Sequence, residues 1–199
     1  LADRENIVLS TDNDDMQFLA GRTVTVTARV PDDVFAAGRD VVFQDAAVGT
    51  AIVAGATVTL NGGTTADLIA AAESLVVDGR VEDDVMVVGR RLAIGPDGVV
   101  AGDARMAGET ITVTGRVGGT LRAAARTIPI DGVIDGKVDV VAETVIVGPA
   151  ARIARDPVYR SGTDPQTADR AVLAAAVRRR APPRPTTCSV RPSPRPTTQ

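Results

Sequence analysis

Hydrophobic residues return along this chain at a fixed spacing. In ITVTGRVGGTLRAAART (111–127) and the next unit, IPIDGVIDGKVDVVAET (128–144), aliphatic residues hold the first, third and seventh positions and threonine closes the unit. All spacings between units are 17 residues except one of 19, and the nine units begin at Ile7, Val24, Val41, Val58, Leu75, Leu92, Ile111, Ile128 and Val145. The third positions are also apolar: Leu9, Val26, Phe43, Leu60, Val77, Ile94, Val113, Ile130 and Val147. The chain is therefore a repeat array.

Within each unit the apolar residues alternate with polar ones, as in VTVTARV (24–30) and LVVDGRV (75–81), which is typical of strands. Apolar residues recur near the first, third, seventh, eleventh and thirteenth positions, which predicts three short strands separated by Gly, Asp or Asn corners. Stacked units would let each strand pair in parallel with its copies above and below. We predict an all-β, single-stranded parallel β-helix of about nine coils, roughly 40 Å long at ~4.8 Å per coil.

Two segments lengthen the repeat. GPDGVVAG (95–102) adds two residues to its unit, and GPAARIAR (148–155) carries a matching insertion in the last unit.

The composition agrees with a narrow, regular interior. Hydrophobic residues make up 44% of the 199 residues, whereas aromatic residues make up only 2%. The absence of His removes His-based acid/base catalysis and His metal sites. The single Cys, Cys188, excludes an intrachain disulfide and a Cys metal cluster. We expect no enzyme, no catalytic residue, no cofactor and no metal.

A left-handed β-helix of the hexapeptide acyltransferase kind is the main alternative fold. It needs multiples of six residues, eighteen per coil. Ile128, Ile134 and Val140 are six apart, but the next unit opens five residues later, at Val145. This 6-6-5 spacing breaks the hexapeptide register in every coil and disfavours that alternative.

The repeats resemble bactofilins, bacterial polymer-forming cytoskeletal proteins. The resemblance covers about residues 7 to 160 and is carried by DDVFAAGRDV (32–41), VVDGRVEDDVMVVGRRLAIG (76–95), TVTGRVGGTLRAAARTI (112–128) and IDGVIDGKVDVVAETVIVGPAARIARD (130–156). It implies a right-handed, triangular β-helix that joins end to end into nucleotide-independent filaments. It also implies a scaffolding role at the bacterial cell envelope, in the cytoplasm and associated with the membrane.

Three polar groups of residues are candidate sites. A column of carboxylates at the tenth position could bind a divalent cation, although Asp also favours corners by bonding backbone N–H groups: Asp33, Asp67, Asp84, Asp103 and Asp156. A charged cluster could imitate a polysaccharide-cleaving site, although we favour a solvated surface: Glu73, Glu82, Asp83, Asp84, Arg90 and Arg91. Closing hydroxyls could face ice or sugar, but we favour corner caps: Thr23, Thr57, Ser74, Thr110, Thr127 and Thr144.

The ends of the solenoid are where function is expected, because terminal coils expose strand edges and an open hydrophobic cross-section. In the first coil, Asn13 and Gln17 stand where later coils have apolar residues, which predicts a polar cap or an adaptable contact. The candidate residues for the core ladder and for polymerisation are Ile7, Leu9, Val24, Val26, Val145, Val147 and Tyr159.

The sequence divides into four segments: an N-terminal segment (1–6), the β-helix (7–160), a short amphipathic helix that could cap the end (164–180) and a disordered Pro/Arg-rich tail (181–199). Asp164 and Pro165 suit the start of a helix, and Arg178–Arg180 suit its end. Residues 160–199 carry eight Arg and two Asp, whereas the first 159 residues are acidic. Such a tail could bind an anionic membrane, a polyanion or the acidic body of another subunit.

We therefore expect a self-assembling scaffold whose main partner is a second copy of itself, with a membrane surface or cell-wall-associated proteins as further partners and no nucleic acid. The alternatives are a β-helix enzyme acting on carbohydrate or transferring acyl groups, and an extracytoplasmic binding stalk that would be anchored by a signal or membrane segment.

Overall fold

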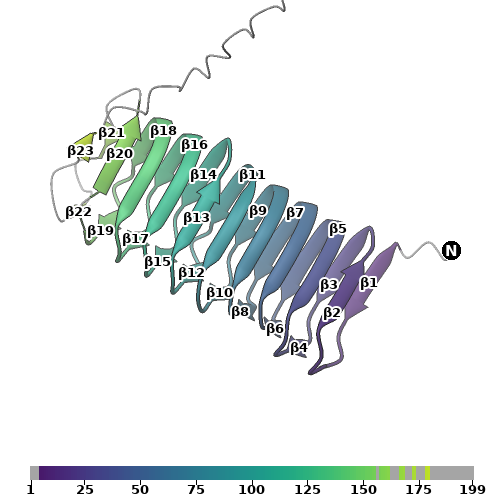
Figure 1. The fold of residues 1–199 in the computed structure, drawn as a ribbon. Coiled ribbons are helices and arrows are strands. Elements are labelled where there is room, and N and C mark those ends of the chain that lie inside the picture. The colour runs from purple at the N-terminus through teal and green to yellow at the C-terminus, as the bar shows by residue number, and fades with distance from the viewer. Residues whose placement is uncertain (1–4, 156, 162–165, 169–171, 174–177, 180–199) are drawn as a thin grey trace, which may run out of the picture.

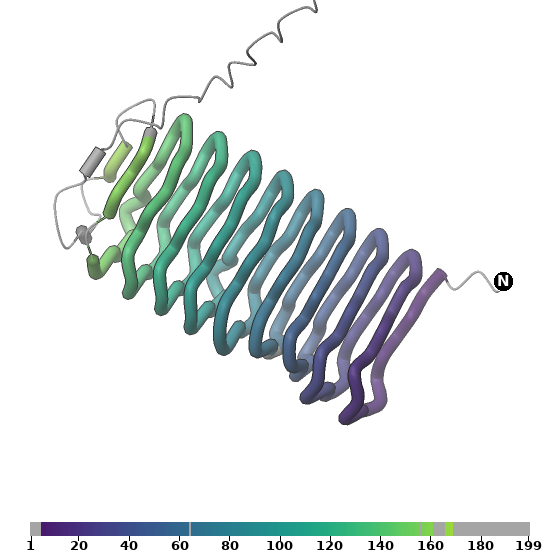
Figure 2. Tube along the Cα trace, in the orientation of Figure 1, coloured from purple at the N-terminus to yellow at the C-terminus, as the bar shows by residue number. Residues whose placement is uncertain are grey.

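The computed structural model describes residues 5–155, 157–161, 166–168, 172–173 and 178–179. These residues form a parallel β-solenoid of about nine turns and include no helix (Figure 1). Successive turns have a similar outline and follow one another along a single axis (Figure 2). The all-β parallel solenoid predicted from the repeat is confirmed.

Each coil has three faces that belong to two sheets. A 14-stranded sheet contains long strands that bend at a corner, and it covers two faces. Its full-length strands are β5 (Val34–Gln44), β7 (Ala51–Asn61), β9 (Leu68–Val77), β11 (Val85–Ile94), β16 (Leu121–Ile130) and β18 (Val138–Val147). The corner interrupts the strand in two coils, giving β2 (Gln17–Ala20) with β3 (Thr23–Val26), and β13 (Ala104–Ala107) with β14 (Thr110–Val113); β1 (Asn6–Leu9) begins the sheet.

The residues before this corner form the first face, and those after it form the second face. The third face is a nine-stranded sheet of two-residue strands. Its members are β4 (Arg29–Val30), β6 (Ala47–Val48), β8 (Thr64–Thr65), β10 (Arg80–Val81), β12 (Val99–Val100), β15 (Arg116–Val117), β17 (Val133–Ile134), β19 (Arg152–Ile153) and β22 (Val172–Leu173).

The strand register matches the repeat read from the sequence. The unit openings pair across the second face in parallel, from Ile7 with Val24 through Ile128 with Val145. The third positions follow the same register, for example Val26 with Phe43 and Ile130 with Val147. Identical spacing along the chain therefore becomes vertical alignment in the solenoid.

The core is a set of aliphatic columns. In the coil that opens at Val24, the five predicted inward positions are all buried: Val24, Val26, Val30, Val34 and Ala36. Thr65 is the one polar residue that is fully buried among the described residues, and its hydroxyl lies 2.7 Å from the Gly49 carbonyl oxygen and 2.8 Å from that of Asp67. Burial of aliphatic side chains is the main stabilising contribution in such an interior.

Small residues occupy the corner between the first and second faces, glycine in most coils and Ala72, Ala125 and Ala142 in the others, because adjacent coils approach closely there. A Cβ added at Gly38 would lie 2.7 Å from the carbonyl oxygen of Gly21, and one at Gly55 would lie 2.9 Å from that of Gly38. Side chains at these positions would therefore force the coils apart.

Both insertions lie at the corner between the second and third faces. The amide of Gly98 donates to the Gly95 carbonyl at 3.0 Å, and Ala151 donates to Gly148 at 3.2 Å, so each insertion closes a short turn. Pairing then resumes in register, with Val99 beside Arg80 and Arg152 beside Val133.

In the coils that open at Val41 and Val58, the buried residue of the third face lies at the eighth position instead of the predicted seventh. Val48 and Thr65, rather than the residues before them, are the buried partners of Val30 and Val81 on the third face. The additional residue lies at the preceding corner, where Asp45 has φ of 50° and Gly62 has φ of 70°. A residue with left-handed backbone conformation accommodates one additional residue at this corner, and the strands of the first face that follow keep the 17-residue register.

The helix expected over residues 164–180 lies largely outside the described residues. After β20 (Pro157–Ser161), the described parts of residues 164–180 include β21 (Gln166–Thr167), β22 and β23 (Arg178–Arg179), which pair with β18, β19 and β20. These residues continue the solenoid as short strands. The remainder of the predicted helix, Asp156 and the whole of 181–199 lie outside the described residues.

Candidate functional site

The N-terminal end of the solenoid leaves apolar core positions incompletely covered. Ile7 and Leu9 of β1 are half-buried, whereas Val24 and Val26, their partners in the next coil, have 0% exposure. Leu19 of β2 is also half-buried against the same core. These three side chains form an apolar patch at the end of the columns, which we call the end patch.

Strand β1 also presents an edge. The carbonyl oxygens of Glu5 and Leu9 accept hydrogen bonds from Thr23 and Thr27 of the next coil, at 2.8 and 2.9 Å. Residues of a parallel strand alternate between its two neighbours. The backbone groups of Asn6 and Val8 therefore point away from β3, to the side where no described strand lies.

The two polar residues of the first coil bond locally. The Asn13 carboxamide accepts from the Asp15 amide at 2.9 Å, and the Gln17 carboxamide donates to the Asp15 carbonyl at 2.8 Å. Gln17 pairs with Val34, so it occupies the column position expected from the sequence. The N-terminal end therefore combines a polar segment with the end patch.

The other candidate ladder residues lie within the columns. Val24, Val26, Val145 and Val147 have at most 1% exposure. Only Ile7 and Leu9 of the predicted set lie at the open N-terminal end. The structure thus separates the seven predicted residues into two end residues and five interior residues.

Tyr159 fills the core near the C-terminal end. It is fully buried in β20, where it pairs with Val140 on one side and Arg179 on the other. Its hydroxyl has no hydrogen-bond partner among the described residues, and burial raises the pKa of the phenol. Tyr159 acts as a large core residue rather than as an end contact.

The aspartate column binds the backbone of the following coil. The carboxylates of Asp33, Asp67, Asp84 and Asp103 accept from the amides of Thr50, Asp84, Asp103 and Thr120, at 3.3, 3.0, 2.8 and 2.7 Å. The corner interpretation is therefore confirmed for these four residues. Among the described residues, no group of three acidic or Cys side chains is placed to hold a metal ion.

Asp84 has the strongest electrostatic environment of this column. Its second oxygen accepts from Arg105 at 2.8 Å, and Arg105 also contacts Asp103 at 3.0 Å. Hydrogen bonds from the Arg105 side chain and then from the Asp103 amide lower the pKa of the Asp84 carboxyl. This network holds together the corners of two successive coils.

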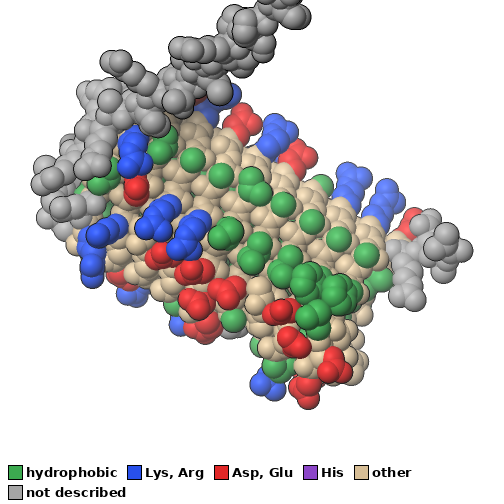
Figure 3. Space-filling model, in the orientation of Figure 1, with side chains coloured by type: hydrophobic (Ala, Val, Ile, Leu, Met, Phe, Trp, Pro, Cys, Tyr) green, Lys and Arg blue, Asp and Glu red, His purple; other side chains and the backbone are tan. Residues whose placement is uncertain are grey.

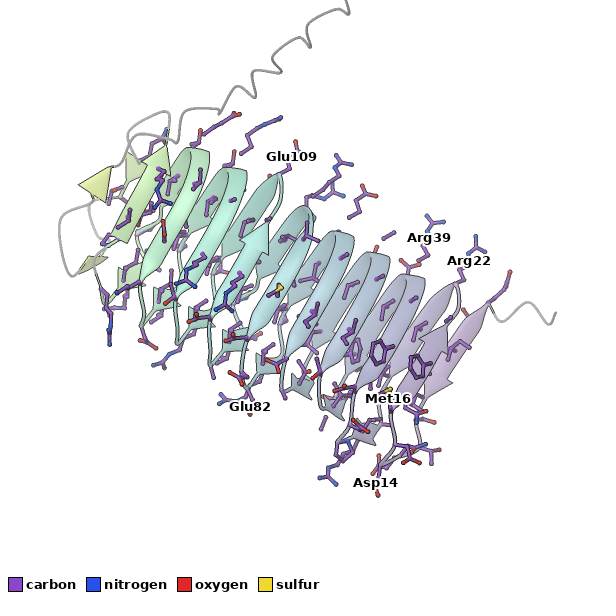
Figure 4. All side chains as sticks on the ribbon, viewed as in Figure 1. Asp14, Met16, Arg22, Arg39, Glu82 and Glu109 are labelled. Atoms are coloured by element: carbon purple, nitrogen blue, oxygen red, sulfur yellow. The ribbon has the colours of Figure 1, made fainter. Side chains whose placement is uncertain are left out.

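The predicted charged cluster divides between two edges of the solenoid. Glu73 pairs with Arg90 at 2.9 Å at the corner between the first and second faces. Glu82 pairs with Arg80 on the third face, where hydrogen bonding to Arg80 lowers the Glu82 pKa. Figure 4 shows Glu82 and Glu109 on opposite edges. These carboxylates form exposed ion pairs and do not converge on one site.

The closing hydroxyls are vertically aligned but interrupted. Thr23 pairs with Asp40, which pairs with Thr57, and Arg91 lies between Ser74 and Thr110. The column is therefore a mixed polar edge rather than a continuous hydroxyl ladder.

An apolar surface on the first face was not predicted. A shallow groove of about 1100 Å³ follows this face from Phe18 to Arg160. Figure 3 shows hydrophobic side chains gathered over the first coils, between acidic and basic edges. The rings of Phe18 and Phe35 stack with centroids 4.8 Å apart.

The sequence contained a signal for this surface. Phe18, Phe35, Ile52, Ile69 and Met86 follow one another at 17-residue spacing, at a position where strand alternation points the side chain outward. The inward positions that define the repeat do not reveal this outward apolar surface.

The described residues contain no helix that could cross a membrane. Comparison of the chain with family models, with curated proteins and with solved structures finds no match in any of the three.

Proposed function

We propose that this protein is a structural scaffold that assembles end to end into filaments without a nucleotide. The observation that carries the proposal is the N-terminal end, where the end patch occurs together with the edge of β1 that no described strand covers. A second solenoid placed on this end would bury Ile7, Leu9 and Leu19 and supply hydrogen-bond partners to the backbone of Asn6 and Val8.

The mechanism is continuation of the solenoid beyond one chain. Parallel pairing already stacks the coils within the chain, and the same 4.7–4.9 Å spacing can extend across a junction between chains. Burying the end patch stabilises the junction by the hydrophobic effect, at roughly 25 cal/mol per Å² of apolar surface.

The resemblance of residues 7 to 160 to bactofilins supports the same proposal. By that resemblance the solenoid is a single-stranded, right-handed β-helix, and the filament is a cytoskeletal element at the bacterial cell envelope. We place it in the cytoplasm, associated with the membrane, where its partners are further copies of the chain and envelope proteins.

The test changes one backbone donor. Val8→Pro removes an amide that the solenoid does not use, because that group points away from β3, and Pro at an edge prevents pairing with an added strand. Val8→Ala is the matched control, since it removes the same exposed side chain and keeps the amide. We expect filaments in electron micrographs and rapid sedimentation for wild type and Val8→Ala, and short or absent filaments for Val8→Pro.

A charged end patch provides a second measurement. Ile7→Asp should weaken assembly at unchanged β-sheet circular dichroism, because it places a carboxylate in the contact. If wild type sediments as a monomer at all salt concentrations, or if Val8→Pro polymerises like Val8→Ala, stacking at this end is wrong.

A further inference from the structure

The first face carries two outward columns of contrasting size. Large side chains form one column, which we call the apolar stripe: Phe18, Phe35, Ile52, Ile69 and Met86. Two residues further along each strand lies the small column: Ala20, Ala37, Ala54, Ala71 and Val88. The stripe is a ridge and the small column is a furrow beside it, and together they line the groove.

The stripe is exposed far beyond what a solvated sheet face needs. Phe18, Ile69 and Met86 are 73%, 43% and 52% exposed, Phe35 and Ile52 are half-buried, and the five residues are contiguous over five coils. Contiguous apolar surface of this kind marks an interaction site.

We propose that this face binds a second copy of the chain, side by side and parallel, about a two-fold axis that runs along the solenoid between the two columns. Such an axis keeps each coil opposite its counterpart and reverses the strand direction. The large column of each copy then lies over the small column of the other. An antiparallel pair would instead set large residues against large residues.

The charges flanking the stripe are complementary under the same rotation. Asp14, Asp15, Asp32 and Asp33 precede β2 and β5 at one edge of the face. Arg22 and Arg39 follow the first-face strands at the other edge, where Arg22 also lies 3.8 Å from Glu5 of its own chain and is still 61% exposed. Figure 4 shows Arg22 and Arg39 opposite Asp14 across the apolar surface. The two-fold axis brings the acidic edge of each copy to the basic edge of its partner, which favours this orientation.

The later coils do not extend the apolar contact. Arg105, Arg122 and Asp139 continue the outward column. Arg105 and Arg160 are held by carboxylates of their own chain, at 2.8 Å from Asp84 and 2.9 Å from Asp139. Pairing is therefore centred on the first half of the solenoid.

The contact is small for one pair of chains. Five coils at about 4.8 Å, each about 13 Å wide, give roughly 300 Å² of flat face per copy, against about 800 Å² per partner in a standard interface. A single pair is therefore weak. The pairing does not require end stacking, but end stacking would repeat it along two filaments and strengthen it.

Cross-linking tests the pair and its orientation. In the full chain with Cys188→Ser, a variant with Ile52→Cys is mixed with one that has Ala54→Cys and treated with a short bis-maleimide at high protein concentration. We expect heterodimers to form faster than either homodimer. The antiparallel arrangement predicts a different product, between Phe18→Cys and Met86→Cys, which lie about 19 Å apart in a parallel pair.

The same mixture measures the contribution of the stripe. Phe18→Lys with Phe35→Lys should reduce the 52–54 heterodimer about tenfold, as expected for loss of two aromatic anchors. Val42→Lys with Val76→Lys is the matched control, because it adds the same two charges to outward positions of the second face. In the Val8→Pro background the heterodimer should persist, which separates lateral pairing from end stacking.

Three results would overturn the proposal. Preferred cross-linking between positions 18 and 86 would show that the two copies pair antiparallel and not parallel. Phe18- and Phe35-dependent binding to phosphatidylcholine or phosphatidylglycerol vesicles, without the 52–54 product, would assign the face to lipid. Equal cross-linking in the stripe and control variants would show that the contact is non-specific.

Discussion

At the scale of single residues, the aspartates at the corner after the third face act between coils. Each of the four described carboxylates bonds the backbone amide of the next coil, and so contributes to the stacking itself. These bonds span 17 or 19 residues, which accounts for the vertical alignment of the carboxylates. Asp84 additionally holds Arg105, and it is the residue where charge is most directly linked to stability.

The Asp84 charge predicts a pH dependence. A carboxyl with a folded pKa below its usual ~3.9 stabilises the fold above that pH, and the contribution is lost as the pH falls through the folded value. Asp84→Asn should therefore lower the melting temperature near pH 7, and its difference from wild type should shrink as the pH falls below the usual aspartate pKa.

Thermal denaturation followed by circular dichroism measures this difference. Asp97→Asn is the control, because Asp97 is exposed in the turn between Gly95 and Gly98. If the melting temperature of Asp84→Asn lies below that of wild type by the same amount at every pH, the charge of the Asp84 carboxylate is not what stabilises the fold.

At the scale of strands, alternation decides which substitutions the solenoid tolerates. Val147 has 1% exposure, and its neighbour Ile146 in β18 is 38% exposed on the outer side. Val147→Asp should unfold the protein or cost more than about 4 kcal/mol, because it buries an unpaired charge. Ile146→Asp should cost less than about 1 kcal/mol. The same contrast applies to Val24 and Thr25.

Chemical denaturation at low protein concentration separates folding from assembly. Equal losses of stability for Val147→Asp and Ile146→Asp would contradict the inward assignment of the third position.

The strand pattern was predictable wherever spacing alone determined it. The openings from Ile7 to Val145 gave the correct register because a parallel solenoid converts a constant repeat into vertical pairing. Asp45 was not predictable in this way, since one left-handed residue shifts the third-face strand without altering the 17-residue period. The helix expected from Asp164 and Pro165 rested on local signals, and because most of its residues lie outside the described part of the chain it stays a prediction.

The end patch illustrates what sequence could and could not give. Ile7 and Leu9 were recognised because they open the first unit. That the backbone groups of Asn6 and Val8 point away from β3 could be known only from the hydrogen bonds that Glu5 and Leu9 accept in the structure. The outward stripe from Phe18 to Met86 could have been predicted from the sequence, because its residues recur at the same 17-residue spacing at an outward position of the repeat.

At the scale of the whole molecule, each coil contacts its neighbours and little else, so coils are interchangeable units. Deletion of residues 111–127 removes one full period and joins Thr110 to Ile128, which is the residue that opens the next unit. We expect this shortened chain to fold cooperatively, with a lower melting temperature because one coil interface is lost.

Deletion of residues 111–119 is the matched control, because it places inward residues of one strand beside outward residues of the next. It should produce an unfolded or aggregated chain by circular dichroism and size-exclusion chromatography. Cooperative folding of both deletions would contradict a register fixed by the period.

The turns at Gly95–Gly98 and Gly148–Ala151 show where this rod accepts added length. Both arise at one corner, and pairing beyond each is undisturbed. Peptides grafted at that corner in chosen coils would project in a single row along the rod, at intervals that are multiples of about 4.8 Å. The molecule could thus serve as a ruler on which epitopes or enzymes are displayed at set separations.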